Sequence, residues 1–232
     1  MKPLYSSRLR NPFLRSAFLT AAVLALGSAA AQADTHTWDD TINASWFLAG
    51  KWSPEWVNGG TSIALVNSGY VYADASVTAS SLTIGDGIGS AEAKNLFNNA
   101  FAGIGSIIIN SDGRLSGGSN TTTHLGSITL NGGTISGSDT GGTAALVGIF
   151  NFDDTVHVTA DSTISVTGAG VTLGQTGGTQ FNVDSGKTLS VTGTIVNKAP
   201  YVPDTGLIKT GDGTMNLTST NTYTGGTTVN AG

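Results

Sequence analysis

A short pattern of alternating residues recurs along this chain and limits what the chain can fold into. The pattern is an apolar residue, any residue and a second apolar residue, followed by small or turn-forming residues. The six units begin at Leu82, Ile107, Ile128, Ile164, Leu189 and Met215. Successive starts differ by 25, 21, 36, 25 and 26 residues. Alternation with a period of two places both apolar side chains of a unit on one face of a β-strand.

One short strand cannot bury its apolar face alone, so equivalent strands must stack into a continuous core. Two units align further, because residues 160–168 (ADSTISVTG) match residues 185–193 (SGKTLSVTG) at an offset of 25. The Gly, Asn and Asp residues that follow the units suit turns. We therefore predict an all-β fold, a parallel β-helix (β-solenoid) of about six or more coils. The alternative is an antiparallel β-sandwich, whose strands recur at a shorter interval of about 8–12 residues.

The N-terminal segment has the composition of a secretory signal peptide. Residues 1–15 carry four Lys and Arg and no acid, residues 16–31 are apolar, and the small residues AQA end at Ala33. We predict cleavage after Ala33, with an N-terminal membrane anchor as the alternative.

Removal of residues 1–33 changes the charge of the chain. It leaves six Lys and Arg against fifteen acids, a net charge of −9. An acidic surface repels phosphate backbones, so nucleic acid is not an expected partner. The chain has no cysteine, so its core and hydrogen bonds must hold the fold without disulfides.

Residues 34–62 stand apart because they contain all four tryptophans of the chain. We expect this Trp-rich segment to cap the N-terminal end of the β-helix coils, which we place at residues 63–204. Trp side chains bury a large apolar area, so a role in a cap or core is favoured. The alternative is an exposed aromatic platform on which sugars stack.

Two further segments interrupt the repeated pattern. Residues 90–101 (SAEAKNLFNNAF) contain helix-forming residues and predict a short surface helix or loop, with Leu96 and Phe97 as anchors. Residues 136–156 fall within the 36-residue step and are expected to form an extra partial coil or an inserted loop.

The last segment, residues 205–232, has a motif with a known likeness. The sequence GLIKTGDGTMNLTSTNTYTGGTTVNAG resembles the autotransporter-associated β-strand repeat, also called the passenger-associated transport repeat. The motif positions, all expected to be structural, fall on Gly206, Leu207, Lys209, Gly211, Gly213, Met215, Leu217, Asn221, Tyr223, Gly225, Thr227, Val229 and Gly232. Met215 stands where Leu is commoner in the family. The segment TWDDTINASWFLAGKWS also resembles, more loosely, the start of proteins that carry this repeat.

The resemblance implies an exported passenger domain that folds outside a Gram-negative-type bacterium as a right-handed β-helix. Such chains cross the inner membrane by a signal peptide and the outer membrane with the help of a C-terminal β-barrel, and the repeat assists passage and folding. The implied partners are the export machinery and the outer membrane, with surface polysaccharide or a host or neighbouring cell surface as further candidates. No barrel pattern occurs in these 232 residues. We therefore expect this chain to be the N-terminal fragment of a longer protein with more repeats and a barrel.

No residue pattern indicates a catalytic, metal or cofactor site. His36, His124 and His157 lack metal-ligand spacing and are expected at the surface or in turns. Asp153 and Asp154 are adjacent and are interpreted as solvated loop residues, not as a catalytic pair of carboxylates. The GDG turns lack the tandem repetition that calcium-binding repeats require. We therefore predict a protein without cofactor or metal that is not an enzyme.

The sequence supports three hypotheses for function. The leading one is a cell-surface passenger whose β-helix stalk is used in adhesion. The second is a secreted β-helix enzyme acting on polysaccharide, which would need two or three carboxylates converging in a groove. The third is a structural unit that only assists the export of the segments C-terminal to it.

Overall fold

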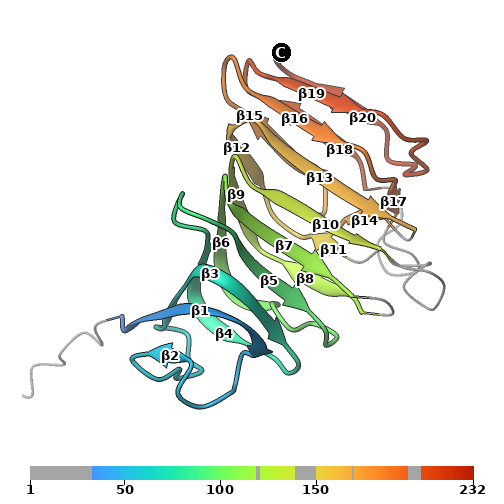
Figure 1. Ribbon diagram of the computed structural model, residues 1–232. Helices are drawn as coiled ribbons and strands as arrows, with labels where there is room; N and C mark the ends of the chain where they lie inside the picture. Colours follow the sequence, from blue (N-terminus) through green and yellow to red (C-terminus); the bar gives the residue numbers. More distant parts are fainter. Residues whose placement is uncertain (1–32, 119–120, 139–149, 169, 198–204) are drawn as a thin grey trace, which may run out of the picture. The chain divides into compact units, whose positions relative to one another are not determined.

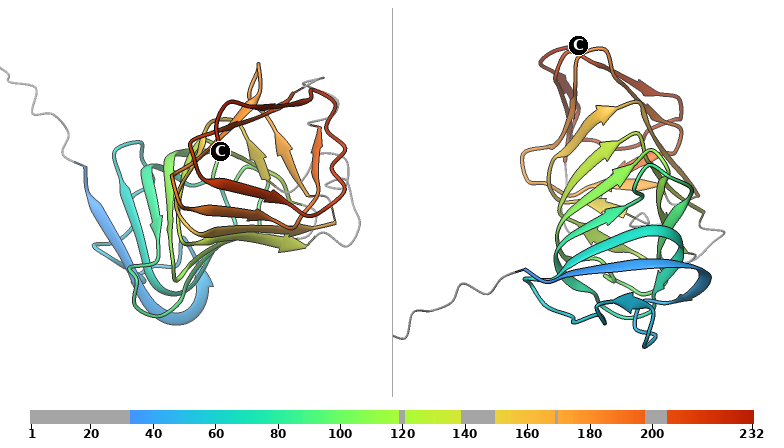
Figure 2. Two further views of the ribbon diagram at one scale, coloured as in Figure 1. Left: turned by 90° about the horizontal axis from the view of Figure 1, so that it is seen from above. Right: turned by 60° about the vertical axis from the view of Figure 1, so that its left-hand side comes forward.

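The structure is a computed structural model that describes residues 33–118, 121–138, 150–168, 170–197 and 205–232 (Figure 1). Within these ranges all regular secondary structure is β-strand, and there is no helix. The strands stack coil upon coil in parallel sheets, as two further views also show (Figure 2). The predicted parallel β-solenoid is confirmed, and the β-sandwich alternative is wrong. The predicted signal peptide lies outside the described residues, apart from Ala33.

The strands form three faces, and each of the four coils from β6 to β17 contributes one strand to each face. Face 1 contains the first half of β3 (Ile63–Ala73), β4 (Thr78–Ile84), β6 (Gly103–Asn110), β9 (Ser127–Asn131), β12 (Val156–Ala160), β15 (Thr179–Val183), β18 (Leu207–Thr210) and β20 (Thr227–Val229). Face 2 contains the second half of β3, β5 (Ala91–Asn95), β7 (Gly113–Gly117), β10 (Thr134–Ser138), β13 (Ser162–Thr167), β16 (Thr188–Val191) and β19 (Thr214–Leu217). Face 3 contains β8 (Thr123–Leu125), β11 (Phe150–Phe152), β14 (Val171–Leu173) and β17 (Ile195–Asn197).

The N-terminal strand continues the same stack. β1 (Thr35–Ser45) pairs in parallel with both halves of β3, and β2 (Trp52–Ser53) pairs with β1 in the antiparallel sense. β3 belongs to faces 1 and 2 at once, so the chain must bend within this strand. Gly69 stands at the bend with a φ of 72°, and a Cβ there would overlap the carbonyl oxygen of Asp40 on β1. Only glycine fits this position, because it has no Cβ and tolerates positive φ.

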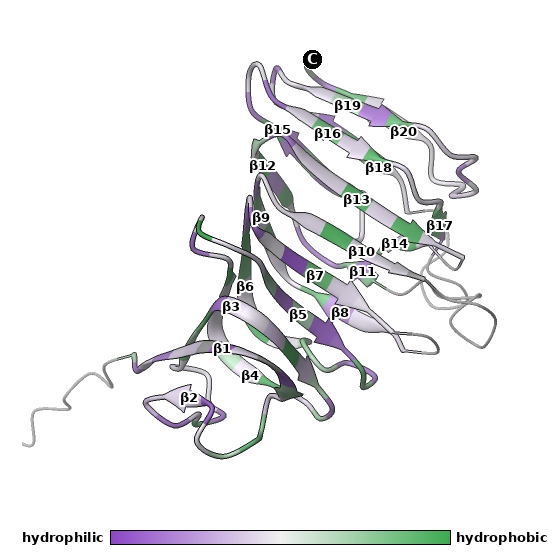
Figure 3. Ribbon diagram, viewed as in Figure 1, coloured by the Kyte–Doolittle hydropathy of each residue, from purple (hydrophilic) through white to green (hydrophobic). Residues whose placement is uncertain are grey.

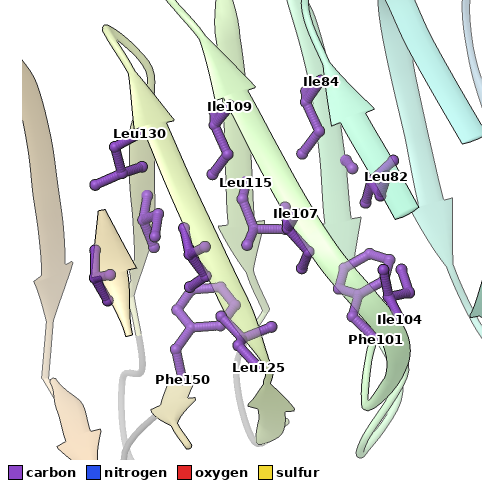
Figure 4. Packing of buried hydrophobic residues seen from close by; sticks show 14 of the residues in the cluster. Leu82, Ile84, Phe101, Ile104, Ile107, Ile109, Leu115, Leu125, Leu130 and Phe150 are labelled. Carbon is purple, nitrogen blue, oxygen red and sulfur yellow. The ribbon is translucent and has the colours of Figure 1, made fainter. Parts of the chain in front are cut away.

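The core consists of the inward side chains of the stacked strands. Ile107 on β6 pairs in register with Ile128 on β9, which pairs with Val156 on β12 and then Phe181 on β15. All four are at most 1% exposed. Figure 4 shows such aliphatic and aromatic side chains meeting between neighbouring coils. Each coil therefore buries its apolar residues against the next, as the alternating pattern predicts.

The 36-residue step does not measure the length of one coil. Ile128 lies on face 1 and Ile164 lies on face 2, so the two residues are not equivalent and the step is not a coil length. Along face 1, Ile128 pairs with Val156, 28 residues later. The proposed insertion at residues 136–156 overlaps residues 139–149, which lie outside the described part of the chain.

The offset of 25 between the two best-aligned units also differs from the observed register. It pairs Ile164 with Leu189, whereas in the structure Ser162 pairs with Leu189 and Ile164 pairs with Val191. A shift of two residues leaves every side chain on the same face, whereas a shift of one would turn the apolar residues outward. The apolar pattern alone therefore does not distinguish the two registers.

The predicted helix or loop at residues 90–101 is wrong in its first half. Ala91–Asn95 form β5, which pairs in parallel with β3 and β7. Ala91, Ala93 and Asn95 point inward and are buried, because the neighbouring strands supply the partners that this segment lacks alone. Leu96 and Phe97 are 41% and 45% exposed, so they do not anchor the segment as expected.

The aromatic residues of the Trp-rich segment pack against one another. Trp38, Trp46 and Trp52 are buried, and the Trp46 and Trp52 rings lie 4.7 Å apart. Their burial leaves no exposed platform for a sugar. His36 is also buried, with Nδ1 3.1 Å from the carbonyl oxygen of Pro54 and its ring edge-on to Trp56. The expectation of a surface or turn position is therefore wrong for His36.

Candidate functional site

The motif residues of the predicted repeat lie in the last coil of the described chain. Leu207 and Lys209 are on β18, Leu217 is on β19, and Thr227 and Val229 are on β20. β18 pairs in parallel with β15 before it and with β20 after it. The repeat segment, residues 205–232, therefore continues the same stack of coils.

Lys209 occupies a core position, although its side chain is cationic. Its register partners are Phe181 on one side and Val229 on the other, and Lys209 itself is 5% exposed. The ammonium group donates to the carbonyl oxygens of Thr210, Gly211 and Ala231 at 2.9, 2.7 and 3.0 Å. A buried charge must be hydrogen-bonded, and these three bonds join the turn after β18 to Ala231, which follows β20 in the next coil.

The motif glycines lie where backbone segments of neighbouring coils approach closely. Gly211 has a φ of 73°, and a Cβ there would overlap the carbonyl oxygen of Val183 on the coil before. A Cβ on Gly213 would overlap Asp184 in the same way. A Cβ on Gly206 would lie 2.7 Å from the carbonyl oxygen of Gly225. The spacing of these glycines therefore reflects the contact between coils.

The remaining motif residues connect the repeat to its neighbours. The Asn221 side chain accepts a hydrogen bond from the Ile195 backbone N–H at 2.8 Å, which joins it to β17. The Tyr223 hydroxyl lies 2.5 Å from Thr227 Oγ1. Met215, Leu217 and Tyr223 pack against the core while staying partly exposed, whereas Val229 is 61% exposed.

Replacement of Gly211 by Ala tests the close approach of the coils. We expect Gly211→Ala to lower the free energy of unfolding by about 1–3 kcal/mol more than Gly186→Ala does, because only Gly211 adds a steric overlap. Gly186 is the matched control, since it has a φ of 72° and no atom within 4 Å of a built Cβ. Guanidinium denaturation of both variants provides the comparison, and equal losses would show that the coils leave room for a methyl group.

The other histidines and acids form pairs between coils. His124 Nδ1 on β8 is hydrogen-bonded to the carboxylate of Asp153, which follows β11. His157 Nε2 on β12 lies 2.8 Å from Asp184 Oδ1. The Asp154 side chain accepts a hydrogen bond from the Thr155 N–H at 2.7 Å. Among the described residues, no three His, Cys, Asp or Glu side chains are grouped as a metal site would require.

A second surface, which the sequence did not reveal, lies on the outside of face 2. Outward residues of β3, β5, β7, β10 and β13 align in two rows across the strands. One row contains Tyr70, Glu92, Arg114, Thr134 and Thr163, and the other contains Tyr72, Lys94, Ser116, Ser136 and Ser165. Figure 3 shows hydrophilic stretches side by side on β5 and β7. We call these two rows the face-2 groove.

The face-2 groove contains two adjoining depressions that share Glu92 and Arg114. The first has a volume of about 420 Å³ and reaches Asp112 and Thr134, and the second has a volume of about 330 Å³ and reaches Lys94 and Thr167. The outward residues of β7 and β10 next to Arg114 are small, and Ser116 and Ser136 are buried at 2% and 7% exposure. Hydroxyl groups therefore form the floor of the second depression, and the charged side chains of Glu92, Lys94 and Arg114 line it as well.

The polar groups of the groove are partly connected. The Ser116 hydroxyl donates to the Glu92 carboxylate, Arg114 Nε donates to Ser136 Oγ at 2.5 Å, and Arg114 Nη1 lies 4.0 Å from Glu92 Oε2. The Asp112 carboxylate accepts the backbone N–H groups of Asp86 and Gly87 at 3.3 and 2.9 Å. Asp112 therefore holds the 86–87 turn, while Glu92 and Arg114 face the groove.

The aromatic end of the groove is formed by β3. The Tyr70 and Tyr72 ring centroids lie 6.1 Å apart, and Lys94 Nζ lies 5.7 Å from the Tyr70 centroid. The sequence signal for the groove is present as GYVYA, AEAKN and GRLSG, in which outward polar or aromatic residues alternate with inward small or apolar ones. The central strand of the three, β5, was missed because residues 90–101 were predicted to form a short surface helix or loop.

Comparison with known proteins agrees with the motif. Residues 207–232 match the family described as passenger-associated-transport-repeat. The chain carries a passenger-associated-transport-repeat. The resemblance predicted from the motif residues is therefore confirmed. The matched residues include Lys209, Gly211 and Gly213, whose contacts are described above.

A relative of the passenger-associated-transport-repeat chain supports the same class of protein. The adhesin BmaC autotransporter of Brucella suis biovar 1 (strain 1330) is 36% identical over 116 residues. The match covers 47% of this chain and only 3% of that protein, so this chain spans a small part of its relative's length. The repeat and this relative together indicate an autotransporter passenger, secreted and located at the cell surface and outer membrane.

No solved structure matches the chain significantly. Among the described residues, none forms a helix with the length and hydropathy needed to cross a bilayer.

Proposed function

We propose that this passenger is displayed on the cell surface as an adhesive stalk, and that residues 205–232 assist its outer-membrane passage and folding. In this proposal residues 1–33 direct export, residues 34–62 cap the stack and residues 63–204 form its coils. The export machinery and the outer membrane are its partners during secretion. The adhesin name of the Brucella relative supports the adhesive role.

One observation carries the proposal, namely the way β18, the first strand of the repeat segment, joins the coils on both sides of it. Lys209 stands in line with Phe181 in the core and bonds to three carbonyl groups, one of them in the next coil. In a solenoid each coil is stabilised by its nearest neighbours, so a docked coil is a template for the next one. A repeat segment that pairs with the coil on each side of it would therefore help further coils to fold onto the stack as the chain emerges outside the cell.

Surface display is tested on intact cells that produce the full chain. An antibody against residues 34–232 should label the cells without permeabilisation, and labelling only after lysis contradicts display. Lys209→Met should lower the amount at the surface relative to Lys187→Met, at equal total synthesis. Adhesion is tested by attachment of producing and non-producing cells to a host-cell layer, and equal attachment contradicts the adhesive role.

The β-solenoid and the adhesin-named relative fit a protein that is not an enzyme. One observation favours the enzymatic alternative, because Glu92 and Asp112 line the same depression. Both Asp112 oxygens accept backbone N–H groups of the 86–87 turn, however, which supports a structural role for this carboxylate. Release of new reducing ends from a polysaccharide, lost in Glu92→Gln, would favour the enzyme over the stalk.

A further inference from the structure

We propose that the face-2 groove binds an acidic polysaccharide, with sugar rings against Tyr70 and Tyr72 and sugar carboxylates against Lys94 and Arg114. The inference gives a ligand class to the adhesive role proposed above and rests on it only for its biological setting. The binding itself is a property of the purified chain and is tested without cells.

The two rows of the face-2 groove repeat at a regular interval. Outward residues of a parallel stack recur at the spacing of the strands, about 4.8 Å. Tyr70, Glu92 and Arg114 are therefore aligned across successive strands, as are Tyr72, Lys94 and Ser116. An extended polymer lying across the strands meets similar side chains at regular intervals. A compact ligand would use only one of the two adjoining depressions.

The floor and the edge of the groove carry polar and aromatic groups that suit a sugar. The hydroxyl groups of Thr134, Ser165 and Thr167 line the two depressions and can hydrogen-bond to sugar hydroxyl groups. The buried Ser116 and Ser136 hydroxyls bond to Glu92 and Arg114 and orient these two side chains. Tyrosine combines an apolar ring face with a polar tip. Both tyrosines are half-buried, so their rings are held by the neighbouring strands and part of each ring reaches solvent.

Two cations in the groove favour an acidic sugar. The chain is acidic, yet Lys94 and Arg114 both line the second depression, where Glu92 is the acid among the lining residues. Elsewhere, Lys51 forms an ion pair with Asp40, and the Lys209 ammonium group bonds to carbonyl groups inside the fold. The Arg114 side chain is 52% exposed, and its Nε bond to Ser136 orients the guanidinium group. Guanidinium binds carboxylate in a planar two-pronged arrangement, which favours an acidic sugar over a neutral one.

Affinity electrophoresis of the full chain through gels that contain polysaccharide tests this inference. Polygalacturonate is the acidic probe and dextran the neutral one. We expect retardation by polygalacturonate that weakens as salt is added, since exposed charges are screened, and little retardation by dextran. No retardation by polygalacturonate, or equal retardation by both polymers, overturns the inference.

Variants identify the groove as the binding surface. The double variant Lys94→Gln/Arg114→Gln should weaken binding to polygalacturonate about 10-fold or more, because charge-assisted bonds are lost. Tyr70→Ala should weaken it as well, whereas Lys187→Gln is the control that removes one cation away from the lining. Arg114→Lys keeps the charge and the fold, and it should still weaken binding because it loses the planar fork.

The circular dichroism spectrum of each variant reports whether it is folded. If the folded Arg114 variants bind as the original chain does, the groove is not the site and the inference fails. If the purified chain shows no binding while producing cells still attach to the host-cell layer, the ligand class is wrong and the adhesive role stands.

Discussion

Trp46→Ala should cause the largest loss of stability of any single substitution in the Trp-rich segment. Trp46 is fully buried, and its ring lies 4.7 Å from Trp52, 5.2 Å from Trp56 and 6.0 Å from Phe101. Because Phe101 precedes β6, the Trp46 ring joins the N-terminal segment to a later coil. Truncation of a buried Trp to Ala costs about 3–5 kcal/mol of the free energy of unfolding, through lost burial and the cavity left behind.

Guanidinium denaturation followed by circular dichroism measures this loss without relying on tryptophan fluorescence. Phe47→Ala is the control, because Phe47 is the next residue and is 40% exposed, and surface changes of this kind stay within about 0.5–1 kcal/mol. The ends of a solenoid need a cap, so the first coils of the Trp46→Ala variant should also exchange their amide hydrogens faster. A loss no greater than that of Phe47→Ala would contradict a capping role for residues 34–62.

Lys209→Met should destabilise the last coils by about 2–4 kcal/mol. The substitution keeps an unbranched side chain of similar length but removes three hydrogen bonds from a charged donor, each worth about 1.5–3 kcal/mol, while it relieves the desolvation of the buried charge. The carbonyl groups of Thr210, Gly211 and Ala231 lose the donor that joins them. The net effect should be local, because each coil depends on its neighbours.

Amide hydrogen exchange places this effect along the chain. Protection should fall at Asn230, whose N–H bonds to the Lys209 carbonyl, and at Leu207, whose N–H bonds to Gly226. Protection at Ala91, in a coil far from the repeat, should stay as it was. Lys187→Met is the matched control, since it makes the same change at a partly exposed lysine. Unchanged protection in Lys209→Met would mean that the ammonium group does not hold the last coil.

The sequence determined that this chain stacks short strands. Alternation at Leu82, Ile107 and Ile128 requires a shared core, because one such strand cannot bury its own apolar face. The sequence also identified the repeat segment by its glycines. Gly211 and Gly213 let the backbones of two neighbouring coils approach closely, because glycine has no Cβ. These features are local, so a short window of residues contains the whole signal.

Tertiary structure alone decided which coil residues meet. Ile128 pairs with Val156 and not with the similar Ile164, and Ile164 pairs with Val191 and not with Leu189. The apolar pattern accepts any register that keeps the same side chains inward, so the choice depends on turn lengths and packing over the whole coil. Tertiary structure also decided the conformation of Ala91–Asn95. This segment contains helix-forming residues, yet it is a strand because β3 and β7 pair with it on both sides.

The face-2 groove follows from that register. Tyr70, Glu92 and Arg114 are 22 residues apart in the sequence, an interval that differs from the 25-residue offset of the apolar units. Each of these residues lies in a different strand. The local sequence of one strand does not specify which residue of the adjacent strand will pair with it. Local sequence thus determined the strands, the turns and the repeat. The alignment of side chains across coils depended on the packing of the complete stack, because the register of each strand depends on the lengths of all the turns that precede it in the coil.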